Sequence, residues 1–157
     1  MSTWRRTVEP WTRPAIRTWA RATRGMTLGV RGVVTDAEGR VLLIEHTYVH
    51  GWHLPGGGVE RGQTAEEAMA NELVEEAGVR AIGRPRLVSF HDNGARYPGD
   101  HILLYRITDW EPVEATSRGE IHRVGFFPRR ELPEGATPGT RRRIAEVFGG
   151  AAADPRW

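Results

Sequence analysis

Three carboxylates near the middle of the chain have the spacing that suits a metal ion. Glu75 and Glu76 follow Glu72 by three and four positions. In a helix their side chains would therefore fall within an arc of roughly 100°. Like charges at this spacing repel one another, and no basic residue on the same helical face offsets them. Hard cations such as Mg²⁺ take oxygen ligands, commonly one or two carboxylates with water and substrate phosphates. The cluster indicates either a metal site or a solvated acidic face.

A glycine-rich turn precedes the three carboxylates. Gly56, Gly57 and Gly58 follow Pro55. Consecutive glycines permit backbone conformations and close approaches that side chains would block. Such turns accommodate phosphates or position a helix tightly, although a triple glycine alone is more often a simple turn. Next to three clustered carboxylates, the turn favours the metal site over the solvated face.

One helix is predicted to carry the carboxylates. Thr64 and Glu67 form the T-x-x-E pattern of a capping box, which places the helix start at the next residue after Thr64. Gly78 supplies the stop signal. The predicted buried stripe consists of Met69 and Leu73, four residues apart. The helix should therefore be anchored on one side and present the carboxylates on the other.

Strands are predicted on both sides of this helix in the sequence. Two β-branched segments, at 26–35 and 41–46, flank a turn at 36–39 and are predicted to pair as a hairpin. Further strands are predicted at 86–92, 101–107 and 121–127, and a closing helix at 138–148. This arrangement is typical of an α+β fold with a mixed sheet between helices.

The 157 residues suit one domain, with 39% hydrophobic and 27% charged side chains. No apolar run approaches the roughly 18 residues that a membrane-spanning helix needs. The absence of cysteine excludes disulfides, zinc thiolate sites and thiol nucleophiles. The N-terminus lacks the apolar core of a secretory signal, so the cytoplasm is the expected location. We expect an arginine-rich arm and short helix at 1–24, the domain at 25–149 and a tail at 150–157.

The basic side chains are all arginine, which binds phosphate through its bidentate fork. The net charge of only +2 does not favour nucleic acid as a partner. Arginines are nevertheless concentrated before residue 25, which leaves RNA-end processing as an alternative function. The helix predicted at 14–24 is expected to pack on the domain or on a second subunit, which leaves a homodimer open.

The segment from Gly57 to Val79 resembles a known family motif. It reads G-x5-Q-x7-N-E-L-x-E-E-x-G-V and is similar to the Nudix box, G-x5-E-x7-R-E-U-x-E-E-x-G-U, in which U is a bulky aliphatic residue. The preceding LPGG is also usual in the Nudix hydrolase family. Two positions differ, since Gln63 replaces Glu and Asn71 replaces Arg. The resemblance extends more weakly over residues 26–148 and implies a Nudix-like α/β/α sandwich.

This resemblance implies a metal-dependent pyrophosphohydrolase that cleaves a nucleoside diphosphate derivative by water attack at phosphorus. One to three Mg²⁺ or Mn²⁺ ions would be the cofactor, and a small nucleotide the substrate. The implied metal-binding and catalytic residues are Glu72, Glu75 and Glu76, and the family's additional carboxylate is assigned here to Glu120, with Glu114 as the second choice. The candidate substrate contacts are Gly56, Gly57, Gly58, Arg31 and Tyr48.

The two departures from the motif concern residues that would support the metal ligands. In the family, a charged Glu–Arg pair orients these carboxylates. A neutral hydrogen bond between the amides of Gln63 and Asn71 could replace that pair. Since changes to such supporting residues typically cost 10–100-fold in activity, we expect a working enzyme. The alternative is a catalytically weakened Nudix-fold module that binds nucleotides for regulation.

Overall fold

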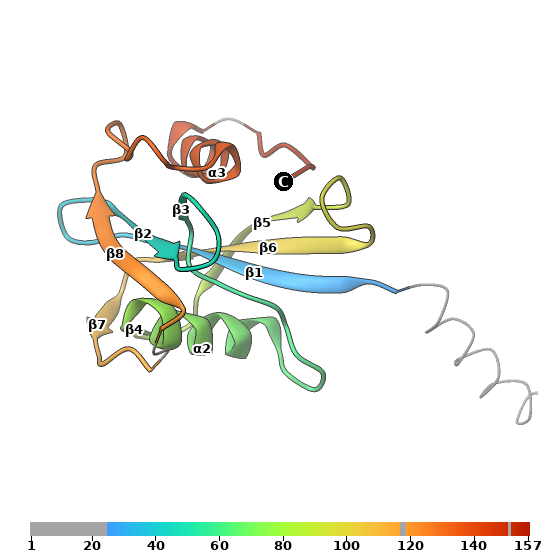
Figure 1. Ribbon diagram of the computed structural model, residues 1–157, viewed down its shortest axis with the longest axis horizontal. Coiled ribbons are helices and arrows are strands. Elements are labelled where there is room, and N and C mark those ends of the chain that lie inside the picture. The colour runs from blue at the N-terminus through green and yellow to red at the C-terminus, as the bar shows by residue number, and fades with distance from the viewer. Residues whose placement is uncertain (1–24, 117–118, 151) are drawn as a thin grey trace, which may run out of the picture.

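The computed structural model describes residues 25–116, 119–150 and 152–157. The arm and helix predicted at 1–24 lie outside these residues. Two helices lie on opposite sides of the strands (Figure 1). The elements are β1 (Thr27–Val34), β2 (Val41–His46), β3 (Trp52–His53), α2 (Ala65–Ala77), β4 (Val79–Ala81), β5 (Arg86–Asp92), β6 (Asp100–Ile107), β7 (Trp110–Pro112), β8 (Ile121–Phe127) and α3 (Pro138–Gly149). In the described part of the chain, no helix is long and apolar enough to cross a membrane.

The strands form separate small sheets between the helices. The first has the order β1-β6-β5, in which β6 runs parallel to β1 and antiparallel to β5. The second, with the order β3-β2-β8, is entirely antiparallel. A third pairs β4 with β7. The predicted α+β class and the mixed sheet are confirmed, although the sheet contains only some of the strands.

The predicted hairpin between β1 and β2 is wrong. The turn at 36–39 is present, and an isolated bridge joins Thr35 to Val41 beyond it. The two strands then separate into different sheets. Strand β1 pairs over its whole length with β6, from Thr27 opposite Asp100 to Val34 opposite Ile107. This pairing joins segments about 73 residues apart, and local turn signals contain no information about it.

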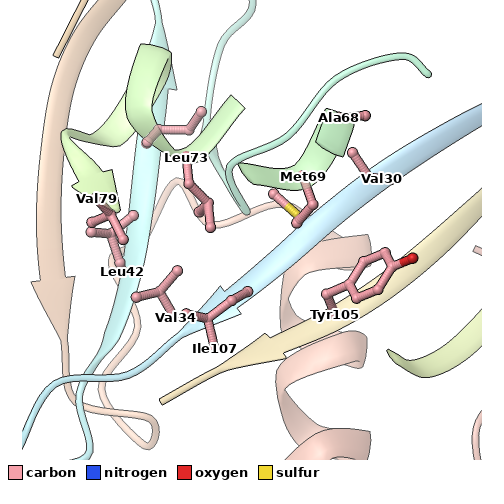
Figure 2. Close-up of a cluster of buried hydrophobic side chains, with 10 residues drawn as sticks. Val30, Val34, Leu42, Ala68, Met69, Leu73, Val79, Tyr105 and Ile107 are labelled. Atoms are coloured by element: carbon pink, nitrogen blue, oxygen red, sulfur yellow. The ribbon is translucent and has the colours of Figure 1, made fainter. Parts of the chain in front are cut away.

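The core that anchors α2 lies between this helix and strands β1, β2 and β6. Met69 and Leu73, the predicted buried stripe, are fully buried there. Figure 2 shows both side chains among Val30, Val34 and other apolar residues of the strands. A second apolar cluster lies under α3 and includes Ile144. These contacts fix the axis of α2 and with it the row of carboxylates.

Both ends of α2 follow the predicted local signals. The Thr64 hydroxyl accepts a hydrogen bond from the Glu67 N–H, and the Glu67 carboxylate accepts one from the Thr64 N–H, which completes the capping box. At the other end Gly78 has φ of 63°, and its N–H reaches the carbonyls of the last turn. The helix is therefore set in register independently of the carboxylates that it presents.

Candidate active site

The glycine-rich turn lies along strand β1. The Val30 N–H donates to the Gly57 carbonyl at 2.9 Å, and the Gly32 N–H donates to the Pro55 carbonyl at 2.9 Å. One residue beyond the glycines, the Val59 N–H donates to the Leu28 carbonyl at 2.8 Å. The turn is thus held by a backbone ladder, which gives it a fixed position beside the carboxylates of α2.

The three glycines meet different neighbours. Gly56 has φ of 139°, and a Cβ there would lie 2.1 Å from the Val30 carbonyl oxygen. A Cβ on Gly57 would lie 2.0 Å from Oε1 of Glu72. Gly56 is therefore required by the backbone, whereas a side chain at position 57 would have to displace the Glu72 carboxylate. Nothing lies within 4 Å of a Cβ built on Gly58, so that position faces open space.

Glu76 is the most enclosed of the three carboxylates, with only 8% of the residue exposed. One carboxylate oxygen, Oε2, accepts a hydrogen bond of 2.7 Å from the Gly56 N–H. Burial raises the pKa of Glu76 to about 7, and the negative charge of Glu72 adds to the effect, while the Gly56 hydrogen bond opposes it. The site therefore holds a carboxylate whose charge is poorly compensated by the protein.

The other two carboxylates of α2 are progressively more open. Glu72 is half-buried against Gly57, and burial together with the charge of Glu75 raises its pKa. Glu75 is exposed. The three side chains predicted as equivalent ligands thus differ in exposure: Glu76 is enclosed, Glu72 is half-buried and Glu75 faces solvent.

Arg31 supplies positive charge to this cluster. It lies on β1, and its Nη1 donates to the Val30 carbonyl at 3.0 Å. Burial lowers its pKa, while the nearby charges of Glu76 and Glu72 act in the opposite direction. No ion pair joins Arg31 to either carboxylate. The guanidinium is thus close enough to influence the carboxylates and is not bound by them.

His46 is a site residue that the sequence reasoning did not single out. It ends β2, and its Nε2 lies 3.8 Å from Oε1 of Glu76. Its ring packs against Tyr48 and His53, with centroids 5.1 and 5.7 Å away. Burial lowers its pKa, which favours the neutral form of the ring. The buried Nδ1 has no hydrogen-bond partner among the described residues. The position of His46 at the end of a predicted strand, before the aromatic-rich stretch that leads into LPGG, could have suggested this role.

Glu120 and Tyr48 reach the same site from separate loops. The Glu120 carbonyl accepts from the Thr47 N–H at 2.9 Å, which ties the start of β8 to the end of β2. The charge of Glu120 raises the pKa values of Glu72 and Glu76. Tyr48 is 70% exposed, and its pKa is raised by partial burial and by the Glu120 charge. The late carboxylate predicted from sequence therefore lies within electrostatic range of the helix carboxylates.

The two unusual motif residues do not bind each other. The Gln63 Oε1 accepts a hydrogen bond of 3.0 Å from the Glu60 N–H, within the turn that precedes α2. Asn71 is exposed, and no hydrogen bond joins it to Gln63. The neutral amide pair suggested by the sequence is therefore absent. Glu76 is held instead by a hydrogen bond from the Gly56 backbone N–H.

The carboxylates fit a hard divalent cation by chemistry, although not by converged geometry. Within residues 25–116, 119–150 and 152–157, no three His, Asp or Glu side chains converge as a ready metal site. Burial, with a smaller contribution from neighbouring carboxylates, raises the pKa values of Glu72 and Glu76, and a cation bound by these oxygen donors would stabilise their charged forms. The residues that would hold it are Glu72, Glu75, Glu76 and Glu120.

Three neighbouring hollows, which share lining residues, open around Arg31, His46 and Asn93. The glycine hollow, of about 570 Å³, is lined by Gly57, Gly58 and Arg31. The central hollow, of about 200 Å³, joins Arg31, His46 and Tyr48 to Asn93. The tryptophan hollow, of about 640 Å³, continues from Asn93 to Trp157. A larger hollow of about 740 Å³ lies near α3, and its lining includes neither Arg31 nor the glycine turn. Together, the three neighbouring hollows provide room for an extended substrate.

Known proteins resemble this chain in sequence. A model described as the NUDIX domain matches residues 25–147. A MutT-like protein of Streptomyces ambofaciens is 33% identical over 121 residues, which cover 77% of this chain and 71% of that protein. A Mycobacterium tuberculosis protein that carries the name MutT4 is 32% identical over 117 residues, which cover 71% of this chain. This chain spans only 43% of the length of that mycobacterial relative.

Solved structures show the same fold. The crystal structure of a MutT Nudix hydrolase from Burkholderia pseudomallei matches with a TM-score of 0.67 and 25% sequence identity. The match covers 79% of this chain and 99% of that one. The two helices and the intervening strands are therefore a shared architecture.

Proposed function

The chain belongs to the Nudix family, and we propose that it hydrolyses a pyrophosphate bond in a nucleoside diphosphate derivative with Mg²⁺ or Mn²⁺ as cofactor. One observation carries this proposal. Glu76 is enclosed, its pKa is raised to about 7, and it is held by the fixed glycine turn within electrostatic range of Arg31. Ionisation of this carboxylate is costly in the protein alone and becomes favourable once a divalent cation neutralises the charge.

The proposed metal-binding residues are Glu72, Glu75, Glu76 and Glu120, for one to three ions. Bound divalent ions would neutralise the pyrophosphate and acidify a water molecule. Among the protein groups, His46 would position the Glu76 carboxylate from its distance of 3.8 Å. Glu120, which is exposed at the start of β8, would accept the proton of the attacking water at its carboxylate.

The substrate contacts follow the lining of the hollows. Arg31 would bind a phosphate oxygen through its guanidinium. Gly58 would let a phosphate approach the backbone, because the space around its Cα is open. Gly56 and Gly57 would act indirectly by holding Glu76 and Glu72. Tyr48, exposed at the rim of the central hollow, would cover the bound substrate.

The test is a panel of nucleoside triphosphates, dinucleoside polyphosphates, nucleotide sugars and ADP-ribose, each assayed with Mg²⁺, Mn²⁺ or chelator. Hydrolysis should require the metal and should be lost in Glu76→Gln. Glu66→Gln is the matched control, because it removes the same charge from an exposed residue of the same helix that pairs with Arg84. Binding of panel members without turnover would support the alternative, a regulatory nucleotide-binding module.

A further inference from the structure

Residues 154–157 are built into the fold beside the candidate site. The Asp92 N–H at the end of β5 donates to the Pro155 carbonyl at 2.8 Å. The Trp157 N–H donates to the Asp92 carbonyl at 2.8 Å. A parallel bridge therefore joins Asp92 to Arg156 at the edge of the first sheet. Figure 1 shows this end of the chain near the loop between β5 and β6.

A buried arginine of α3 binds residues 154–157. Arg143 of α3 is completely buried, and its Nη1 donates to the carbonyls of Asp154 and Arg156 at 3.4 and 3.2 Å. Its Nη2 donates to Glu146 Oε1 at 2.8 Å, and the same oxygen accepts from the Asp154 N–H at 3.0 Å. Nδ1 of His91 donates to the Asp154 carbonyl at 2.7 Å. Since a buried arginine is costly without such partners, docking of the segment supplies two of the acceptors that Arg143 needs.

The Trp157 side chain is fixed by the same cluster. Its ring meets the His91 ring edge to face, with centroids 5.6 Å apart, and Arg143 lies 5.4 Å from its centroid. A Cβ on Gly139 would lie 3.0 Å from the indole nitrogen, so a larger residue there would crowd the ring. Arg142 donates to the Trp157 carbonyl at 2.7 Å. The indole is therefore a preorganised wall, and little conformational entropy would be lost when it binds a ligand.

Trp157 lines two of the three hollows next to the candidate active site. The central hollow runs from Arg31 to Trp157, and the tryptophan hollow extends it past Arg96. Asn93 lines all three hollows. Its Nδ2 donates to Asp100 at 2.7 Å, which leaves the amide oxygen without a donor among the described residues. Trp157 and Arg96 thus line the two hollows that Gly58 does not line, and Asn93 lies where these hollows and the glycine hollow meet.

These groups match the chemistry of a nucleobase. A flat base stacks on an indole, and its edge donates hydrogen bonds to an amide oxygen or accepts them from a guanidinium. A phosphate chain, by contrast, suits the glycine hollow with Arg31. We propose that Trp157 is the stacking contact for the nucleobase, with Asn93 and Arg96 at the base edge. This inference rests on the proposed function for the placement of the phosphates at the other end.

The test measures product binding by the full chain without metal, so that no turnover is needed. AMP and GMP are the probes with a base, and ribose 5-phosphate is the probe without one. Base stacking contributes about 1–3 kcal/mol, so Trp157→Ala should weaken AMP or GMP binding by roughly 5- to 150-fold. Ribose 5-phosphate binding should change by less than about 2-fold, and Trp157→Phe should retain most of the affinity for AMP and GMP.

A fluorescence control distinguishes Trp157 from the other tryptophans. AMP or GMP should quench the emission of the unmodified chain and of Trp110→Phe, because Trp110 instead stacks on Phe126 and donates to the Thr35 carbonyl. Quenching should be lost in Trp157→Phe.

Three results would overturn the inference: unchanged AMP and GMP affinity in Trp157→Ala, an equal loss for ribose 5-phosphate, or no AMP or GMP binding by the unmodified chain at millimolar concentration. Failure of the substrate panel with the expected binding pattern intact would overturn the proposed hydrolysis and leave this base contact standing.

Discussion

Replacing Glu76 by glutamine is expected to stabilise the metal-free protein above pH 7. The pKa of this carboxyl rises from 4.5 to about 7 in the fold, mainly because it is buried. The native state therefore holds the proton more tightly than the unfolded state between these pH values. The stabilisation that protonated Glu76 contributes to the fold is fully present below pH 4.5 and is lost as pH rises through about 7. One pKa unit corresponds to about 1.4 kcal/mol, so the full loss is about 3 kcal/mol.

The assay is equilibrium urea unfolding with chelator at several pH values from 4.5 to 8.5. Glu76→Gln keeps an oxygen that can accept from the Gly56 N–H and removes only the titration. The two proteins should have similar stability at pH 4.5, and the variant should be more stable by about 3 kcal/mol at pH 8. Glu75→Gln is the matched control, because this exposed neighbour should change stability by only a few tenths of a kcal/mol.

Divalent metal provides the second part of the same experiment. Mg²⁺ or Mn²⁺ should raise the stability of the unmodified chain at pH 8, since binding to the native state adds free energy by mass action. The increase should be much smaller in Glu76→Gln. The reasoning would be refuted if Glu76→Gln were no more stable than the unmodified chain at pH 8, or if the difference did not depend on pH. An equal metal response in both proteins would remove Glu76 from the metal site.

Three further predictions concern the glycine turn, the two unusual motif residues and the buried His91. Gly57→Ala should lower hydrolysis at least 10-fold, since the new Cβ would displace the carboxylate 2.0 Å away, whereas Gly58→Ala meets nothing within 4 Å and should fold normally. Gln63→Glu combined with Asn71→Arg should raise activity by about 10–100-fold by restoring a charged pair, and a loss of activity would contradict this account. Burial lowers the pKa of His91 in the native state. As pH falls below 6.5, His91 in the unfolded chain therefore takes up a proton more readily than in the native state, and the stability of the fold decreases. His91→Asn should make that decrease shallower in urea unfolding between pH 5 and 7, and an unchanged slope would exclude this contribution.

The elements that bear the site were predictable where their signals are local. The bounds of α2 follow from the capping box and from Gly78, and the buried stripe follows from residues four apart. Strands β2, β5 and β8 were also predicted with their exact bounds. Strands β3, β4 and β7 contain only two or three residues each, too few to produce a periodic pattern.

The differences among the three helix carboxylates were not predictable from their spacing. Helical periodicity gives Glu72, Glu75 and Glu76 one common face, and it contains no information about what covers that face. Glu76 is enclosed because the Gly56 N–H, 20 residues earlier in the chain, reaches its carboxylate. The docking of residues 154–157 was hidden for a similar reason. It depends on Arg143, a residue type that sequence patterns assign to the surface.

The same contact explains how the site tolerates its unusual motif residues. If the carboxylates depended on a charged partner on the helix, the neutral Asn71 would leave them without support. The Gly56 N–H instead binds Glu76 directly, and a backbone donor is not removed by substitutions on α2. Gln63 meanwhile caps the turn before the helix. The departures at Gln63 and Asn71 should therefore make the positions of the more open Glu72 and Glu75 side chains less precise, and they should leave the Glu76 side chain in place. Metal affinity should accordingly fall more in Glu76→Gln than in Glu75→Gln, which calorimetric titration with Mn²⁺ can measure without any substrate.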